Sequence, residues 1–177
     1  MYVLGLSFFY HDAAAALVKD GALVAAAEEE RFTRKKHDLE FPAGAIRCCL
    51  DRAGITIDQV DHVVFYEKPF VKFLRILETC LASWPRSYMS WVKSMPLWIK
   101  SKLRISSLIQ DELDVEKEII FCEHHLSHAA SAFLVSPYQE AVLLTMDGVG
   151  EWTTTAYGVG RGENFVVTGG KAPEESL

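Results

Sequence analysis

The chain alternates apolar stretches with polar ones, and the spacing of the apolar residues predicts both strands and helices. Short apolar runs bounded by turn signals favour strands, such as the two runs that Lys19-Asp20-Gly21 connects. Apolar residues recur at helical spacing after Pro42, and Gly54 is a suitable end for that helix. The predicted strands cover residues 2–9, 13–18, 22–27, 118–122, 152–159 and 164–168, with two more starting at 60 and 141, and the predicted helices cover 43–54 and 126–135.

Strands that alternate with helices in this way are typical of an α/β protein. The 177 residues suffice for one domain with a sizeable core, or for part of a larger architecture. The sequence contains no internal repeat or low-complexity tract. We therefore expect a folded α/β domain.

Residues 68–110 differ in character from the rest of the chain. From Lys68 to Arg104 the chain contains eight lysines and arginines but a single acidic residue, Glu78. Tryptophans recur every seven residues, at Trp84, Trp91 and Trp98. Pro85 and Pro96 are expected to interrupt the helical pattern. The segment is predicted to be a helical insertion with a packed amphipathic face, and the alternative is a surface for an anionic substrate, a partner domain or a lipid headgroup.

Composition and charge narrow the functional classes. The formal net charge of −6 argues against a dedicated nucleic-acid-binding protein, which usually has a basic excess. The four cysteines form no CxxC pair, which favours a reducing compartment. The start of the chain lacks the basic residues of a signal peptide, and no stretch is long and apolar enough to span a bilayer. We expect a cytoplasmic protein whose partners include neither nucleic acid nor membrane.

The segment EHHLSHAASAF, which begins at Glu123, holds three of the six histidines. His124 and His128 are four residues apart, so on a helix their rings share one face and could bind one metal ion. His125 points about 100° away and is a poorer partner. The alternative is that the histidines are simply polar residues at the start of a helix and bind no metal. The zinc-protease pattern HExxH is not met, which disfavours a metalloprotease.

The segment MDGVGEWTTT places Asp147 at the end of a buried strand, followed by Gly148, Gly150 and Thr153. A carboxylate in such a position can bind a metal, and adjacent glycines allow backbone N–H groups to approach a phosphate. The alternative is a hairpin turn in which the aspartate and glycines satisfy the backbone geometry.

His11 and Asp12 lie between the first two predicted strands. A histidine that titrates near neutrality, oriented by a carboxylate, is a candidate acid or base catalyst. The alternative is a pair of polar residues at a strand corner.

Three segments together resemble the N-terminal part of the O-carbamoyltransferases typified by nodulation protein U and by enzymes that carbamoylate antibiotics. These segments are GLSFFYHDAAAALVKDGALVAAAEEERFTRKKHD, EHHLSHAASAF and TMDGVGEWTTTAYGVG. The resemblance covers nearly the whole chain. It implies the N-terminal half of an actin/hexokinase-like (ribonuclease H-like) domain, with a mixed sheet flanked by helices.

The resemblance also implies an activity and a set of site residues. In that family, carbamoyl phosphate and ATP give carbamoyl adenylate on a second, C-terminal domain, and the first domain transfers the carbamoyl group to a hydroxyl of a sugar or secondary metabolite. The metal is expected to be Fe²⁺. The implied residues are His11 and Asp12 for catalysis, His124, His128 and Asp147 as metal ligands, Gly148, Gly150 and Thr153 near phosphate, and Arg31 and Lys36 as contacts of the carbamoyl donor.

The chain departs from the family pattern because it ends at Leu177. The family's fourth metal ligand, adenosine pocket and activation domain have no counterpart, so we do not expect turnover by this chain alone. The expected partners are a small hydroxyl acceptor, carbamoyl phosphate and that activation domain, and a homodimer is left open. The rival interpretations are a sugar-kinase-like or ATPase member of the same superfamily, a non-catalytic binding or regulatory half-domain, and a relative of the tRNA threonylcarbamoyl transferase.

Overall fold

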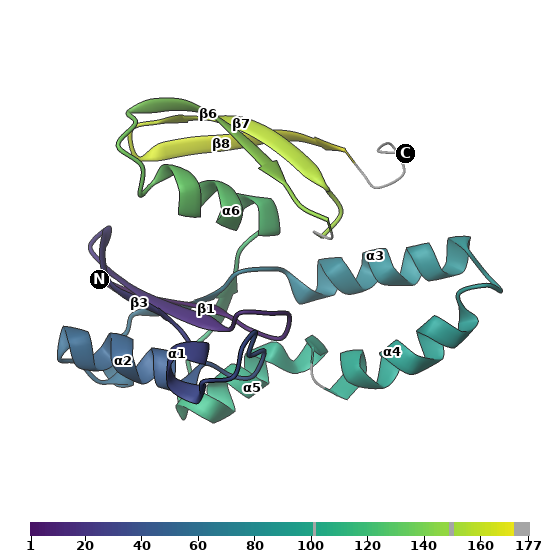
Figure 1. The fold of residues 1–177 in the computed structure, drawn as a ribbon, viewed down its shortest axis with the longest axis horizontal. Coiled ribbons are helices and arrows are strands. Elements are labelled where there is room, and N and C mark those ends of the chain that lie inside the picture. The colour runs from purple at the N-terminus through teal and green to yellow at the C-terminus, as the bar shows by residue number, and fades with distance from the viewer. Residues whose placement is uncertain (101, 149–150, 172–177) are drawn as a thin grey trace. The chain divides into compact units, whose positions relative to one another are not determined.

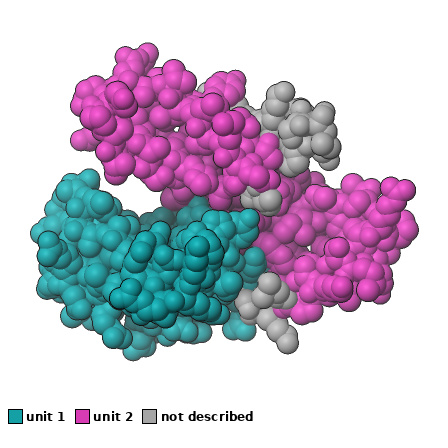
Figure 2. All heavy atoms as spheres, in the orientation of Figure 1, with its two compact units in different colours: residues 1–66, 100–121 teal, residues 67–99, 122–177 magenta. Residues whose placement is uncertain are grey.

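A computed structural model describes residues 1–100, 102–148 and 151–171 of the chain. The chain forms two compact units, each with its own sheet. Figure 2 colours unit 1 (residues 1–66 and 100–121) teal and unit 2 (residues 67–99 and 122–177) magenta. In the described part of the chain, no helix has the length and apolar character needed to cross a membrane.

Unit 1 contains a five-stranded mixed sheet in the order β3-β2-β1-β4-β5. Its strands are β1 (Tyr2–Ser7), β2 (Ala14–Lys19), β3 (Ala22–Glu28), β4 (His62–Phe65) and β5 (Ile119–Phe121). The first three pair antiparallel, whereas β4 pairs parallel with both β1 and β5. Alternate residues of β1 point into the core, so Leu4 and Leu6 are buried.

The longer helices of unit 1 cover one face of this sheet, as Figure 1 shows for α2 and α5. The helical segments are α1 (Glu30–Thr33), α2 (Ala43–Ala53), η1 (Ile57–Gln59), η2 (Lys102–Arg104) and α5 (Ile105–Leu113). Cys49 of α2 and Ile109 of α5 are fully buried against the sheet. The α5 helix therefore belongs to the core of unit 1, although it starts within the 68–110 segment.

Glu29 lies just after β3 and caps the start of α2. Its buried carboxylate accepts hydrogen bonds from the backbone N–H groups of Gly44 (3.1 Å) and Ala45 (2.8 Å). A negative charge is favourable there because the first N–H groups of a helix have no partner within the helix. A Cβ at Gly44 would lie 2.9 Å from the Cβ of Phe32, so the close approach of α1 requires glycine.

Unit 2 contains a three-stranded antiparallel sheet in the order β6-β7-β8, with α6 against one face (Figure 1). Its elements are α3 (Pro69–Ala82), α4 (Tyr88–Lys100), α6 (His124–Phe133), β6 (Glu140–Met146), β7 (Thr155–Arg161) and β8 (Asn164–Lys171). Phe133 of α6 packs against Leu143 and Phe165. A Cβ at Gly160 of β7 would lie 2.5 Å from the Phe133 ring, so this glycine makes room for the helix.

The side of this sheet away from α6 is apolar and exposed. Its exposed residues include Val142, Leu144, Met146, Tyr157, Val159 and Val166. The three residues of β6 in this set alternate along the strand, so they lie on one face. The residues of β6 that alternate with them include the buried Leu143, which packs with α6.

The predicted α/β class and the antiparallel opening are confirmed, and most of the differences lie at element ends. The first strand stops at Ser7 because Phe9 has a left-handed backbone (φ 73°). The predicted helix at 126–135 begins two residues earlier, at His124, because Glu123 is the extended residue that precedes it. Pro96 lies inside α4, so the prediction that it interrupts the helix was wrong.

The three tryptophans of the basic segment do not form one packed stripe. Trp98 is buried and its ring lies 5.8 Å from that of Phe73, whereas Trp84 is 55% exposed. The reason is that α3 ends at Ala82 and α4 begins at Tyr88, so Trp84 lies in the connection between them. The seven-residue repeat therefore crosses a break in the helical structure.

Candidate metal centre

The first turns of α6 position His124 and His128 side by side. Their Nε2 atoms lie 3.1 Å apart and the two rings are nearly perpendicular. This contact follows from the four-residue spacing, because residues i and i+4 are neighbours on a helix surface.

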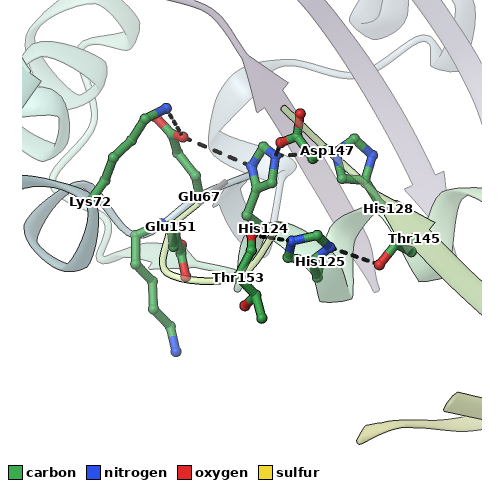
Figure 3. Close-up of polar contacts among 10 residues, drawn as sticks. Glu67, Lys72, His124, His125, His128, Thr145, Asp147, Glu151 and Thr153 are labelled. Atoms are coloured by element: carbon green, nitrogen blue, oxygen red, sulfur yellow. Dashed lines mark hydrogen bonds and ion pairs between the residues drawn. The ribbon is translucent and has the colours of Figure 1, made fainter. Parts of the chain in front are cut away.

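Asp147 reaches the same point from the end of β6. Its Oδ2 lies 2.5 Å from Nε2 of His124, and its backbone N–H donates to the Thr154 carbonyl, which shapes the turn. One ligand atom from each of Asp147, His124 and His128 lies within 4.8 Å of the other two. Figure 3 shows the three side chains pointing toward one another. Imidazole nitrogen and carboxylate oxygen suit zinc and non-haem iron, so these residues fit a divalent transition metal.

The protonation of His124 agrees with that fit. Burial lowers the pKa of its imidazole below the ordinary value, although the hydrogen bond to Asp147 acts in the opposite direction. A lowered pKa favours the neutral ring, and the neutral imidazole is the form that binds a metal.

A buried ion pair lies on the other side of His124. The Nζ of Lys72 donates to Oε2 of Glu67 at 2.6 Å, and the same oxygen lies 3.9 Å from Nδ1 of His124 (Figure 3). Burial lowers the pKa of the Arg75 guanidinium, whereas the charges of Glu67 and Asp147 raise it. Basic residues of α3 thus lie in the electrostatic field of the candidate metal ligands.

Glu151 is a further buried carboxylate near the start of α3. It accepts the backbone N–H of Lys68 at 2.6 Å, and burial raises the pKa of its carboxyl group. The side chain of Lys68 instead bonds Glu123 at 2.9 Å, where Glu123 is 63% exposed.

His125 connects α6 to the sheet. Its Nδ1 lies 2.7 Å from the Thr145 hydroxyl, and its Nε2 donates to the Thr153 carbonyl at 2.6 Å. The structure therefore places Thr153 beside His125. A Cβ at Gly148 would have no heavy atom within 4 Å, and Gly150 lies outside the described residues.

The predicted pair of His11 and Asp12 lies in unit 1, where Asp12 also contacts a third residue, His37. Asp12 Oδ2 lies 2.7 Å from Nδ1 of His11, and Asp12 Oδ1 lies 2.9 Å from Nδ1 of His37. These bonds lower the pKa of the Asp12 carboxyl group, the bond from His37 having the larger effect. His37 was not predicted as a site residue from the sequence, in which its local signal is its place at the end of the charged run ERFTRKKH.

Two backbone hydrogen bonds bring the loops of His11 and His37 together. The N–H of Phe9 donates to the Leu39 carbonyl at 2.9 Å, and the N–H of Ala13 donates to the Asp38 carbonyl at 2.7 Å. Arg31 and Lys36, the two predicted contacts of the carbamoyl donor, lie in the segment that precedes His37. Arg31 is exposed and pairs with Glu28 and Glu30, and Lys36 is exposed.

Comparison with known proteins gives a family match and several relatives. Residues 2–169 match the family model described as carbamoyltransferase N-terminus. The chain is 52% identical over 172 residues to an uncharacterised protein of Synechocystis sp., with 93% of this chain and 28% of that protein covered. It is 39% identical over 158 residues to the nodulation protein NolNO of Sinorhizobium fredii, with 87% and 22% covered. The chain thus spans about a quarter of the length of these curated relatives.

Solved structures give more distant likenesses. YeaZ from Pseudomonas aeruginosa aligns with a TM-score of 0.49 and 12% identity, over 99% of this chain and 68% of that one. The PPX-GPPA enzyme of Aquifex aeolicus aligns with a TM-score of 0.41 and 15% identity, over 95% and 51%.

Proposed function

Because the chain belongs to the carbamoyltransferase family, whose N-terminal model it matches over residues 2–169, we propose that it carries the carbamoyl-transfer site of an O-carbamoyltransferase. The donor is carbamoyl adenylate, made from carbamoyl phosphate and ATP. The acceptor is a hydroxyl of a sugar or secondary metabolite. The 39% identity to a nodulation protein supports this assignment.

His124, His128 and Asp147 would hold a divalent iron. When bound, the ion would supply a Lewis acid that polarises an oxygen of the donor. The observation that carries the proposal is the convergence of these three ligand atoms within 4.8 Å of one another. Arg75 adds a positive charge in their neighbourhood, which favours the anionic phosphate of the donor.

His11 is the proposed general base. Its Nδ1 is engaged by Asp12, which leaves Nε2 to remove the proton of the acceptor hydroxyl. The hydroxyl oxygen attacks the carbamoyl carbon, and the bond from that carbon to the phosphate oxygen breaks. The electron pair of that bond leaves with AMP. A well-placed general base contributes roughly 10²–10⁴-fold to the rate.

Metal content tests the first half of this proposal. The chain is purified anaerobically beside a His124→Ala/His128→Ala variant, and iron is measured in both. We expect one equivalent of iron in the parent chain and none in the variant. Equal metal content in the two proteins would overturn the assignment of the ligands. If neither holds iron, the same comparison is made in the full-length protein, which supplies the family's fourth ligand, and absence of iron there would overturn the assignment.

Transfer is tested in a chimera in which this chain replaces the matched region of the Synechocystis relative. The chimera and the chain alone receive carbamoyl phosphate, ATP and a panel of hydroxylated acceptors. We expect a carbamoylated product only from the chimera, and its loss with His11→Ala. A metal-loaded chimera that retains full transfer with His11→Ala would remove His11 from the mechanism.

A further inference from the structure

The buried pair of Glu67 and Lys72 calls for an explanation beyond stability. Both side chains are about 8% exposed, and their charged atoms lie 2.6 Å apart. A buried ion pair is weak evidence for stabilisation, because the free energy needed to remove two charges from water can exceed the free energy gained from their attraction. The position of the pair beside His124 offers a functional reason.

Glu67 faces the ring nitrogen of His124 that points away from the other candidate ligands. Nε2 of His124 is the atom near Asp147 and His128, whereas Nδ1 lies 3.9 Å from Oε2 of Glu67 (Figure 3). A histidine that binds a metal through one nitrogen usually donates its other N–H to a carboxylate or carbonyl, which fixes the ring and increases its basicity.

We infer that Glu67 orients His124 for metal binding and that Lys72 holds Glu67 in place, an inference that rests on the proposed metal site. Lys72 fixes the carboxylate from α3, one turn into the helix, and Glu67 lies just before that helix. The pair therefore transmits the position of the α3 start to one ligand on α6. Glu67 and Lys72 are positioning residues and touch neither the metal nor the substrate.

The first test compares the affinity of Co²⁺ for the parent chain and for Glu67→Gln, by visible absorption and calorimetry. Glutamine keeps the shape of the side chain and removes its charge. Loss of such a partner typically costs 10–100-fold in metal affinity, and we expect a loss in this range. The matched control is Glu123→Gln, which removes a charge next to His124 in sequence but from an exposed side chain that pairs with Lys68. The control is expected to bind Co²⁺ as the parent chain does.

A second measurement needs no variant, which guards against a Glu67→Gln protein that does not fold. Nitrogen NMR of the parent chain loaded with Zn²⁺ reports which ring nitrogen of His124 carries a proton. We expect Zn²⁺ at Nε2 and a proton on Nδ1. In a folded Glu67→Gln protein the Nδ1–H resonance should shift, because the carboxylate that lies 3.9 Å from Nδ1 is replaced by an uncharged amide. Binding of Zn²⁺ through Nδ1 would overturn the inference.

The outcomes separate the inference from the proposed function. If the parent chain and Glu67→Gln bind Co²⁺ equally well, Glu67 has no positioning role, while the metal site stands. If the parent chain binds neither ion, both the metal site and the role of Glu67 fall. If Glu67→Gln and Glu123→Gln weaken binding equally, the effect is one of general charge, and the inference is overturned.

Discussion

Asp12 holds two imidazole rings with one carboxylate, on a backbone that is unusual for the residues it contains. Phe9, Asp12 and His37 all have positive φ values, of 73°, 55° and 54°. A left-handed backbone at a residue other than glycine costs of order 1–3 kcal/mol, and such residues concentrate at functional sites. The two loops keep this arrangement because backbone hydrogen bonds connect them. His37 therefore belongs with His11 in any account of acid–base chemistry at this corner.

The two hydrogen bonds of Asp12 determine the pH at which its carboxyl group titrates. Because hydrogen bonds from His37 and then His11 lower its pKa in the folded chain, Asp12 stabilises the fold at pH values above its ordinary pKa of 3.8. That contribution is lost as the pH falls through the lower, folded value. Removing the larger donor with His37→Ala should raise the midpoint of Asp12 towards 3.8, as measured by carboxyl ¹³C NMR.

The control for this titration is Asp20, whose lowered pKa comes chiefly from the N-terminal amino group. Asp20 should titrate identically in the parent chain and in His37→Ala. An unchanged midpoint for Asp12 in the variant would contradict the shared carboxylate.

Sequence spacing anticipated the contacts that depend on local geometry. His124 and His128 could be placed on one helix face because the i, i+4 spacing fixes it, and Asp147 could be placed at a strand end from the apolar run before it. Glu67 and His37 escaped notice because their partners are 57 and 25 positions away in the chain. Only the tertiary fold brings such residues together. Binding of iron and the role of His11 stay predictions.

At the scale of elements, the start of α2 depends on a side chain from outside the helix. Glu29 accepts two N–H groups of the first turn, and its carboxylate is buried. Glu29→Ala leaves both donors without this acceptor. We expect a loss of about 1–3 kcal/mol in the free energy of unfolding, measured by urea denaturation.

Glu28→Ala is the matched control for this element. Glu28 is the preceding residue, and its side chain is 45% exposed and pairs with Arg31 at 3.2 Å. A surface pair of this kind is worth about 0–1 kcal/mol, so the control should remain close to the parent chain. Equal losses in the two variants would show that Glu29 does not cap the helix.

The contact of α6 with its sheet depends on the absence of a side chain in β7. Gly160→Ala would place a Cβ within 2.5 Å of the Phe133 ring, which is buried and cannot move freely. Overpacking of this kind typically costs about 1–3 kcal/mol, and we expect a loss of that order in the free energy of unfolding, measured by urea denaturation.

A double variant identifies the cause of this loss. Phe133→Leu removes the ring atoms that the new Cβ meets, so Gly160→Ala should cost less in that background than in the parent chain. Gly5→Ala is the control, because a Cβ there would find only the Ala16 carbonyl, at 3.8 Å. Strictly additive effects of the two changes would contradict the steric explanation.

The hydrophobic pattern predicted most strands but described the 68–110 segment less well. Alternating burial in β1 and β2 follows from the period of a strand, which can be read from the sequence. The break between α3 and α4 contains Pro85 and follows the predicted preference of proline, whereas the passage of Pro96 through α4 overrides that preference. The packing of α5 also depends on the tertiary fold. Its apolar face can be recognised from the sequence, but the sheet that it covers is formed by strands that are distant in the chain.

At the scale of the whole molecule, the proposed chemistry is divided between two compact units. The His11, Asp12 and His37 group lies in unit 1, and the candidate metal ligands with Glu67 and Lys72 lie in unit 2. All the groups proposed to hold or orient the metal thus belong to one compact unit. A metal that binds the folded form stabilises the region whose unfolding releases it.

Hydrogen exchange should therefore respond to a metal in unit 2 and not in unit 1. At a free Co²⁺ concentration 100 times its dissociation constant, the expected stabilisation is about 2.7 kcal/mol, which is roughly a 100-fold slower exchange. Amides of α6 and β6 should show this slowing, whereas those of β1 and α2 should exchange as before, and the His124→Ala/His128→Ala variant should show no response. Equal slowing in both units would mean that they unfold as one body, and slowing confined to unit 1 would place the metal with His11 and His37 instead.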